Sequence, residues 1–429
     1  MTSYPPLLPI PPFTRPVRGS VTLPGSKSIT NRALILGALG RGTVTLHGAL
    51  FSRDTRIMVA ALQALGFLVV PDEKALTITI AGRGGEIPVR EARIDVGNAG
   101  TAARFLTAFV CLRPDGVYQF DGDEAMRRRP IGALLEALEA QGAKASARSF
   151  PFTLQTAGLS GGTVELDASE SSQLLSALLM AAPHARAPLT VQLKGETVSR
   201  PFVAMTERMV QQFAVQPTNY LIEPDATAAS YFLALPLVIT RRGSLTLSGF
   251  HTDHRGRTLQ GDVEFADVME ELGCNFAQTK DGTSVSFPGI ATKVGAEPRK
   301  YELRNFSDTF LTLAAIAPLL DGPTRISGIA HTRKQETDRV AGMARELKKL
   351  GQHVIETEDA LEIHPRPLVA GTEIETYHDH RFAMSFGILG CHDLLKNGQP
   401  WLTIKDPACC AKTFPAFFDL LAGLRAGSH

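Results

Sequence analysis

One short helical pattern recurs six times along the chain, and this recurrence constrains the fold more than any other feature. Each copy is a stretch of mostly Ala, Leu, Ile, Phe and Met that begins abruptly after small or polar residues. The copies begin near Lys27, Asn98, Ser171, Asp225, Asp308 and Asp379. Helices that are apolar nearly all round are buried rather than surface-lying. We therefore expect six buried helices with polar residues only at their starts.

The spacing of the six starts divides the chain into two similar halves. Successive intervals are 71, 73, 54, 83 and 71 residues, so the second set of three follows the first by 198, 210 and 208 residues. A strand followed by a helix also recurs six times, for example residues 42–46 leading to 60–66. Such periods indicate a copied supersecondary unit. The sequence thus predicts an α/β (α+β) fold of two similar domains, each with three strand-and-helix units and buried helices wrapped by sheets. A length of 429 residues suits two such domains.

Composition excludes several classes of function. The chain is 44% hydrophobic and 20% charged with a formal net charge of +1, which argues against a nucleic-acid binder that works through bulk positive charge. Apolar runs of about 18 residues are missing from the sequence, so we expect no membrane span. Five cysteines, without a CxxC pair, favour a reduced cytoplasm. The segments 251–254 and 378–380 contain histidines but lack further evident ligands, so we expect no metal and no organic cofactor.

Cations gather where the buried helices begin. A helix N-terminus offers unpaired backbone N–H groups and partial positive charge, so it attracts anions, whereas a cation there opposes the helix dipole. Lys27, Arg32, Arg104 and Arg381 all lie in or near such first turns. Further cations lie in strand-to-helix turns, and they are Arg129, Arg200, Arg333, Arg339 and Lys412. The pattern indicates a site for phosphate or carboxylate groups, although Ser and Asp at these starts could simply cap the helices.

Seven segments, in order and spacing, resemble the 5-enolpyruvylshikimate-3-phosphate (EPSP) synthase family. They are 23–34 (LPGSKSITNRAL), 97–105 (GNAGTAARF), 128–138 (RRPIGALLEAL), 171–180 (SSQLLSALLM), 336–339 (ETDR), 379–384 (DHRFAM) and 411–415 (AKTFP). The resemblance implies transfer of the enolpyruvyl group of phosphoenolpyruvate to shikimate 3-phosphate in aromatic amino acid biosynthesis. It also implies two domains of three βαβαββ-type units, with residues 1–24 and 224–429 in one domain and residues 25–223 in the other. We expect a monomer with small-molecule substrates only.

The resemblance also implies site residues. Phosphoenolpyruvate would be held by Lys27, Gly100, Arg129, Gln173, Arg339, Arg381 and Lys412. Shikimate 3-phosphate would be held by Ser28, Arg32, Ser171, Ser172, Gln173, Ser199 and Asp308. Proton transfers would fall to Lys27, Asp308 and Glu336, since carboxylates among cations have strongly environment-dependent proton affinities.

The chain departs from the family pattern at a few of these places. Gln335 stands where many members have Lys, and His331 stands where they have Asn. Arg200 and Phe202 replace the Lys and Tyr of another turn, so the shikimate-phosphate contacts at these positions stay open, as does a role for Arg104. Gly100 is retained where an Ala would crowd phosphoenolpyruvate analogues, so we expect inhibition by glyphosate.

Two other functions remain as alternatives. A UDP-N-acetylglucosamine enolpyruvyl transferase would share the donor and architecture, but that family has Lys-Asn where this chain has Lys27-Ser28, and it uses a loop cysteine. Cys111 ends an apolar helix and is expected to be buried. The second alternative is a non-catalytic homologue that binds phosphorylated ligands.

Overall fold

Six apolar helices form the interior of the computed structural model, which describes residues 4–195, 199–239, 243–252, 258–289 and 297–427. Residues 253 and 254 of the histidine segment 251–254 lie outside this described part. The six are α1 (Lys27–Leu39), α3 (Gly100–Val110), α6 (Ser172–Ala181), α8 (Ala226–Ile239), α10 (Phe310–Ile316) and α12 (His380–Gly390). Every residue of α3, α8, α10 and α12 is buried. The expected set of buried helices is thus present, each close to its predicted start.

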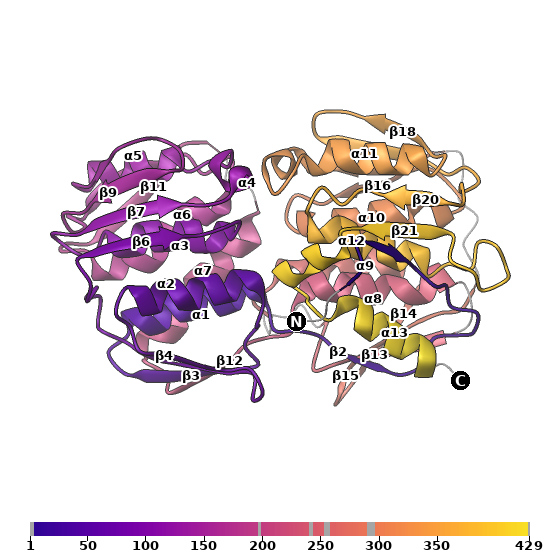
Figure 1. Ribbon diagram of the computed structural model, residues 1–429, viewed down its shortest axis with the longest axis horizontal. Helices are drawn as coiled ribbons and strands as arrows, with labels where there is room; N and C mark the ends of the chain where they lie inside the picture. Colours follow the sequence, from indigo (N-terminus) through magenta and orange to yellow (C-terminus); the bar gives the residue numbers. More distant parts are fainter. Residues whose placement is uncertain (1–3, 196–198, 240–242, 253–257, 290–296, 428–429) are drawn as a thin grey trace. The chain divides into compact units, whose positions relative to one another are not determined.

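The chain divides into two compact units. Unit 1 comprises Met1–Pro24 and Pro224–His429, and unit 2 comprises Gly25–Glu223. In Figure 1 unit 2 runs from indigo to pink, while unit 1 carries the orange and yellow segments together with the N-terminal strands. Helices α1, α3 and α6 belong to unit 2, and helices α8, α10 and α12 to unit 1.

The described strands of unit 2 form three sheets. The first has the order β12-β3-β5-β4 and the second β6-β7-β9-β8, while β10 and β11 pair with each other. In both larger sheets the first pair is parallel and the following pairs are antiparallel. Their bounds are β3 (Thr43–His47), β4 (Val69–Asp72), β5 (Thr77–Ala81), β6 (Glu91–Asp95), β7 (Val117–Asp121), β8 (Lys144–Ala145), β9 (Phe152–Gln155), β10 (Gly162–Leu166), β11 (Leu189–Leu193) and β12 (Asn219–Leu221).

The described strands of unit 1 repeat this arrangement. Sheets β14-β15-β13-β2 and β16-β17-β19-β18 again combine one parallel pair with two antiparallel pairs, and the third sheet has the order β1-β21-β20. Their bounds are β1 (Leu7–Pro9), β2 (Ser20–Thr22), β13 (Gly243–Ser248), β14 (Asn275–Thr279), β15 (Gly282–Phe287), β16 (Arg299–Glu302), β17 (Thr324–Ser327), β18 (His353–Glu356), β19 (Ala360–His364), β20 (Thr372–Ile374) and β21 (Leu402–Lys405). Among the described residues this four-stranded sheet therefore occurs four times, and the third sheet of each unit is smaller.

Small residues let the buried helices approach the sheets closely. A Cβ on Gly37 of α1 would lie 2.7 Å from Ile80 Cγ2 on β5 and 2.9 Å from Val44 Cγ1 on β3, so only glycine permits this approach. Ile78 and Ile80 both point inward from β5, as the period of two in a strand requires. Close packing of this kind makes the starts of the buried helices rigid platforms for polar side chains.

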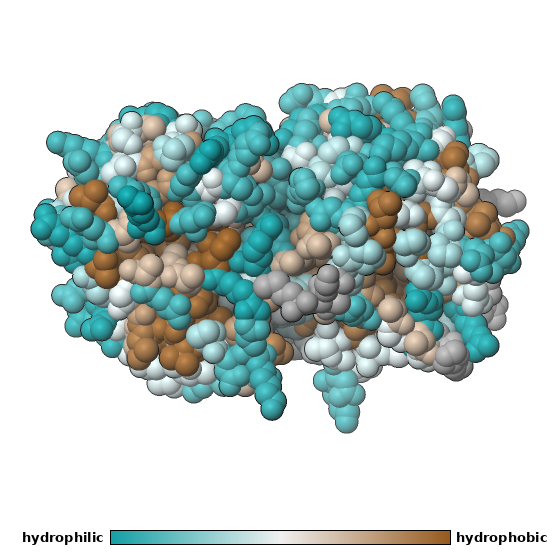
Figure 2. Space-filling model, in the orientation of Figure 1, coloured by the Kyte–Doolittle hydropathy of each residue, from teal (hydrophilic) through white to brown (hydrophobic). Residues whose placement is uncertain are grey.

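Helices that are only partly buried surround this core. They are α2 (Arg53–Ala64), α4 (Glu124–Arg127), α5 (Gly132–Ala140), α7 (Arg200–Ala214), α9 (Phe265–Glu271), α11 (Arg339–Lys349) and α13 (Phe417–Gly427). Short 3-10 turns of importance for the site are η2 (Gly261–Glu264), η3 (Ser307–Thr309), η5 (Ala330–Lys334) and η6 (Pro407–Lys412). On the faces seen in Figure 2, hydrophobic and hydrophilic residues are interspersed, as is normal for a protein surface. Among the described residues, no helix combines the length and apolar character that crossing a membrane requires.

Candidate active site

Arg339, the first residue of α11, is the centre of a buried polar cluster in unit 1. Its side chain is 2% exposed. Its Nε donates to Asp379 Oδ2 at 2.7 Å, its Nη1 to Asp308 Oδ1 at 3.0 Å and its Nη2 to Glu336 Oε2 at 2.8 Å. Gln335 Oε1 also accepts from Arg339 Nη1. Four acceptors therefore fix the guanidinium in one orientation.

Two further cations join the same carboxylates. Arg381 Nη2 donates to Asp308 Oδ2 at 2.6 Å, and Lys412 Nζ lies 3.5 Å from Glu336 Oε1. Asp308 thus bridges two guanidinium groups, and Glu336 bridges Arg339 and Lys412. One network within unit 1 thus contains three predicted phosphoenolpyruvate ligands and two predicted proton-transfer residues. In the sequence these residues are spread over 308–412.

The electrostatics of this cluster favour charged side chains. Burial acts to lower the pKa of Arg339, but the carboxylates of Asp379 and Glu336 outweigh burial and hold that pKa above its ordinary value. The pKa of Arg381 is raised in the same way, with Asp308 as the chief carboxylate that opposes the effect of burial. Both guanidinium groups therefore keep their charge although water is largely excluded.

Asp379 is a member of this network that the sequence indicated only as a helix start. Its carboxyl is fully buried, and Oδ1 accepts from the backbone N–H of Arg381 at 3.0 Å, so it caps α12. The same carboxyl binds Arg339. Asp379 therefore holds Arg339 and the first turn of α12 together. Its place at the start of an apolar helix signalled a cap, but its pairing with Arg339 has no signal in the sequence.

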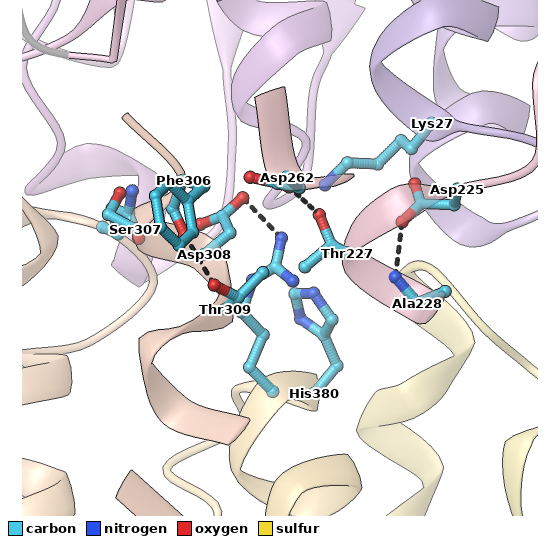
Figure 3. A network of polar contacts seen from close by, with 12 residues as sticks. Lys27, Asp225, Thr227, Ala228, Asp262, Phe306, Ser307, Asp308, Thr309 and His380 are labelled. Atoms are coloured by element: carbon cyan, nitrogen blue, oxygen red, sulfur yellow. Dashed lines mark hydrogen bonds and ion pairs between the residues drawn. The ribbon is translucent and has the colours of Figure 1, made fainter. Parts of the chain in front are cut away.

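Asp262, on η2, lies beside the cluster and was not indicated by the sequence. Its carboxyl accepts from Thr227 Oγ1, and Figure 3 shows it close to Asp308. Burial, reinforced by the negative charge of Asp308, raises the pKa of Asp262 to about 7. Its Oδ1 accepts no hydrogen bond from the described part of the chain. Asp262 is therefore a carboxyl that titrates near neutral pH next to a predicted proton-transfer residue.

Two of the departures from the family pattern, His331 and Gln335, also lie near this cluster. His331 Nε2 is 2.8 Å from Ser307 Oγ, the residue before Asp308. Burial lowers the pKa of His331, so its imidazole is neutral at physiological pH. Gln335, which contacts Arg339, supplies an acceptor where a Lys would bring a further positive charge. Both side chains thus act on the network through hydrogen bonds rather than through charge.

Unit 2 carries a second group of predicted ligands. Lys27, the first residue of α1, lies 3.4 Å from the buried carboxylate of Asp54. Arg129 Nη1 donates to Asn98 Oδ1 at 3.4 Å. A Cβ on Gly100 would lie 2.6 Å from Arg129 Nη2, so the first residue of α3 directly adjoins the guanidinium. Arg129 and Gly100, predicted to contact the same substrate, are therefore neighbours.

Arg32 is held inside unit 2 by contacts with the protein. Its Nε donates to Thr206 Oγ1 at 2.7 Å, its Nη1 to the Ser28 carbonyl at 3.0 Å and its Nη2 to Ser176 Oγ at 3.1 Å. The guanidinium also lies 5.0 Å from the centre of the Phe105 ring. Burial lowers the pKa of Arg32 to about 9, which leaves it charged at neutral pH.

Arg104 on α3 is buried in a similar way. Its Nη1 lies 3.2 Å from Met126 Sδ, and its Nη2 donates to the carbonyl of Pro130. That carbonyl directly follows Arg129, so Arg104 supports the segment that carries a predicted ligand.

The predicted serine ligands lie at three helix starts, and Ser28 is the second residue of α1. Ser171 caps α6, where its Oγ accepts from the Gln173 backbone N–H at 3.3 Å, and Ser172 is the first helical residue. The Oε1 of Gln173 is buried and accepts no hydrogen bond from the described residues. Ser199 has a left-handed conformation (φ 51°, ψ 51°) before α7, which begins at the exposed Arg200. Three of these side chains are therefore grouped on α6.

The surroundings of Cys111 and the grouping of potential metal ligands can be described directly. Cys111 at the end of α3 is buried, and burial raises the pKa of its thiol far above the ordinary range. Among the described residues, no three His, Cys, Asp or Glu side chains are grouped so that they could hold a metal ion.

Comparison with known proteins places the chain in a family. The model of the EPSP synthase (3-phosphoshikimate 1-carboxyvinyltransferase) family matches residues 13–219 and 214–421. A 3-phosphoshikimate 1-carboxyvinyltransferase from Opitutus terrae is 53% identical over 99% of each chain, and one from Nostoc punctiforme is 39% identical over 95% of this chain and 97% of its own. The EPSP synthase structure from Acinetobacter baumannii has the same fold, with a TM-score of 0.76, 23% identity, and coverage of 97% of this chain and 98% of its own. The chain belongs to the EPSP synthase family.

Proposed function

We propose that this enzyme transfers the enolpyruvyl group of phosphoenolpyruvate to the 5-hydroxyl of shikimate 3-phosphate through the residues of these two clusters. The reaction releases inorganic phosphate and belongs to the shikimate pathway of aromatic amino acid biosynthesis. The observation that carries the residue assignment is the buried network in which Arg339 and Arg381 share Asp308 while Arg339 and Lys412 share Glu336.

The cations of both units are suited to phosphoenolpyruvate, which carries a phosphate and a carboxylate. In unit 1 the ligands are Arg339, Arg381 and Lys412. In unit 2 they are Lys27, Arg129 and Gln173, together with the backbone at Gly100. An Arg guanidinium can bind either anionic group through two parallel N–H bonds, whereas Lys acts as a point charge. The carboxylates that hold the unit 1 cations fix their positions before substrate arrives, which reduces reorganisation during the reaction.

Shikimate 3-phosphate would be held by hydroxyl and amide groups at helix starts. The N-terminus of α6 carries Ser171, Ser172 and Gln173. Ser199 precedes α7, and Ser28 lies in the first turn of α1. The N-terminal ends of these helices attract the 3-phosphate. Arg32 would contribute through its charge and through its hold on the Ser28 carbonyl, because its hydrogen bonds are directed to the protein.

We assign the proton transfers to two carboxylates and one lysine. The substrate 5-hydroxyl must lose a proton, and the methylene carbon of phosphoenolpyruvate must gain one to form a tetrahedral intermediate. Loss of phosphate and of a methyl proton from that intermediate then gives the enolpyruvyl ether product. We assign the hydroxyl proton to Asp308, whose carboxylate is held in a fixed position by two guanidinium groups. Glu336 and Lys27 would serve the proton transfers at the carbon.

Charge-neutral variants test these roles. Asp308→Asn and Glu336→Gln keep the side-chain shape but cannot take up a proton at neutral pH, so kcat should fall by about 10²- to 10⁴-fold. Binding of each substrate, followed by calorimetry, should weaken far less. The control is Glu373→Gln, which removes an exposed carboxylate paired with Lys405 and should leave kcat unchanged. Full turnover by both site variants would contradict the assignment.

Two further properties belong to this proposal. The described part of each unit contains its own core of buried helices and sheets, so we propose a monomer, which sedimentation velocity would test. The five cysteines are free and buried. That state suits a reducing compartment, and we place the enzyme in the cytoplasm.

A further inference from the structure

Two strained turns in unit 1 immediately precede the segments that carry Arg381 and Lys412. Tyr377 and His378 have φ values of 55° and 58°, and the next residue caps α12. Asp406 has φ 48° and ψ 54° and immediately precedes η6, which ends at Lys412. Left-handed backbone is unfavourable for most residues other than glycine, although Asn, Asp and His adopt it more readily than the rest, and surrounding contacts help to hold it.

A direct side-chain contact joins the two turns. His378 Nδ1 lies 2.7 Å from Asp406 Oδ2, so each strained residue holds the other. The His378 side chain is 87% exposed. Exposed pairs of this kind contribute little to the stability of a fold. The His378–Asp406 contact therefore matters less for the stability of the fold than for the position of the two turns that it joins.

A second contact ties the first turn to α11, the helix that begins at Arg339. Tyr377 Oη donates to Glu346 Oε1, and the Glu346 carboxylate is fully buried. The other carboxylate oxygen, Oε2, accepts from the Glu375 backbone N–H at 3.0 Å. The guanidinium of Arg345 also lies 5.3 Å from the centre of the Tyr377 ring. The turn is thus anchored on α11 through Tyr377 and on η6 through His378.

The three predicted phosphoenolpyruvate ligands of unit 1 lie on the three segments that these contacts connect. Arg339 begins α11, Arg381 lies in the first turn of α12, and Lys412 ends η6. We propose that His378 and Asp406 are positioning residues, which set the place of Lys412 relative to Arg381 for binding of phosphoenolpyruvate. This inference rests on the proposed function, because it takes these cations as phosphoenolpyruvate ligands.

The proposal predicts a selective kinetic effect. His378→Ala and Asp406→Ala should each raise KM for phosphoenolpyruvate about fivefold or more, because an anion site of fixed cations is sensitive to shifts below 1 Å. KM for shikimate 3-phosphate should stay within about twofold of wild type. The double variant should be no worse than the poorer single variant, since both changes remove the same contact.

Conservative and matched variants exclude a general structural effect. Asp406→Asn keeps an acceptor for His378 and tolerates left-handed backbone, so it should restore KM to near the wild-type value. His364→Ala removes another His–carboxylate pair of unit 1, with Glu362 at 2.9 Å, and should change neither KM. Lys396→Gly relieves a left-handed residue (φ 54°) away from the cations and should also leave KM unchanged.

The outcomes separate this inference from the proposed function. Absence of turnover by the wild-type enzyme with both substrates would refute the proposed function, and the inference with it. If wild-type turnover is present, an unchanged KM for phosphoenolpyruvate in His378→Ala refutes the inference alone. Additive effects in the double variant, or equal rises in both KM values, also refute it.

Discussion

Substitution of Gly100 by Ala separates the binding of phosphoenolpyruvate from the stability of the fold. The added Cβ would lie 2.6 Å from Arg129 Nη2, 2.8 Å from Nη1 and 2.9 Å from Cζ. Ordinary contacts are about 3.5–4.0 Å, so the guanidinium must move by about 1 Å. Arg129 can move because the contact involves the far end of a long side chain.

The magnitude follows from what Arg129 is expected to bind. A hydrogen bond to a charged group contributes about 1.5–3 kcal/mol. Loss of one such bond corresponds to a rise in KM for phosphoenolpyruvate of roughly 10- to 100-fold. In contrast, Ala is favoured over Gly in a helix by up to about 1 kcal/mol, so the free energy of unfolding should be unchanged or slightly higher. KM for phosphoenolpyruvate should therefore rise, while the free energy of unfolding should not fall.

Steady-state kinetics and urea unfolding measure the two quantities. Gly423→Ala is the matched control, because Gly423 lies within helix α13 and its Cβ would meet no heavy atom within 4 Å. The control should gain stability without any change in KM. A KM for phosphoenolpyruvate within twofold of wild type in Gly100→Ala would refute the assignment of Arg129. A loss of more than about 2 kcal/mol of stability would refute the claim that the guanidinium, rather than the backbone, gives way.

Three further predictions concern the thiol, the titrating carboxyl and an inhibitor. Cys111→Ala should leave turnover intact, because the thiol is buried and unreactive; a loss of turnover with the fold retained would favour a catalytic cysteine. The pKa of Asp262, raised from 3.8 to about 7, means that the folded state binds its proton more tightly, so the wild type should lose stability as pH rises from about 4 to 7. Asp262→Asn should remove this loss, and urea unfolding should then show a gain relative to wild type on the order of 4 kcal/mol at pH 8 compared with pH 4; parallel pH profiles would contradict it. Glyphosate should inhibit in competition with phosphoenolpyruvate, and absence of inhibition at millimolar concentration would count against an unobstructed site at Gly100.

The fold was largely predictable because its repeat is local. Each buried helix is recognised from its own composition, and its start from one polar residue. The predicted starts differ from the observed ones by only a few positions, for example at Asp308, which lies in η3 before α10 begins at Phe310. Such shifts reflect a 3-10 first turn, which composition does not specify.

The site was less predictable because its pairings are distant in the sequence. Cations near helix starts predicted an anion site, and in the structure Arg339 and Arg381 both pair with the partly buried carboxylate of Asp308. The same rule also selected Arg32 and Arg104, whose printed partners are hydroxyl, carbonyl and sulfur atoms rather than carboxylates. Partners such as Thr206, 174 residues from Arg32, become visible only in the folded structure. Asp262 escaped notice for the same reason, since its partner Thr227 lies 35 residues away in the sequence.

The most direct test of the account is a measurement of phosphate release by the purified protein with defined pairs of substrates. Phosphate should appear only when phosphoenolpyruvate and shikimate 3-phosphate are both present, in a one-to-one ratio with an enolpyruvyl ether of shikimate 3-phosphate. Replacement of the acceptor by UDP-N-acetylglucosamine should abolish release. Phosphate release with UDP-N-acetylglucosamine, or none with the first pair, would contradict the account.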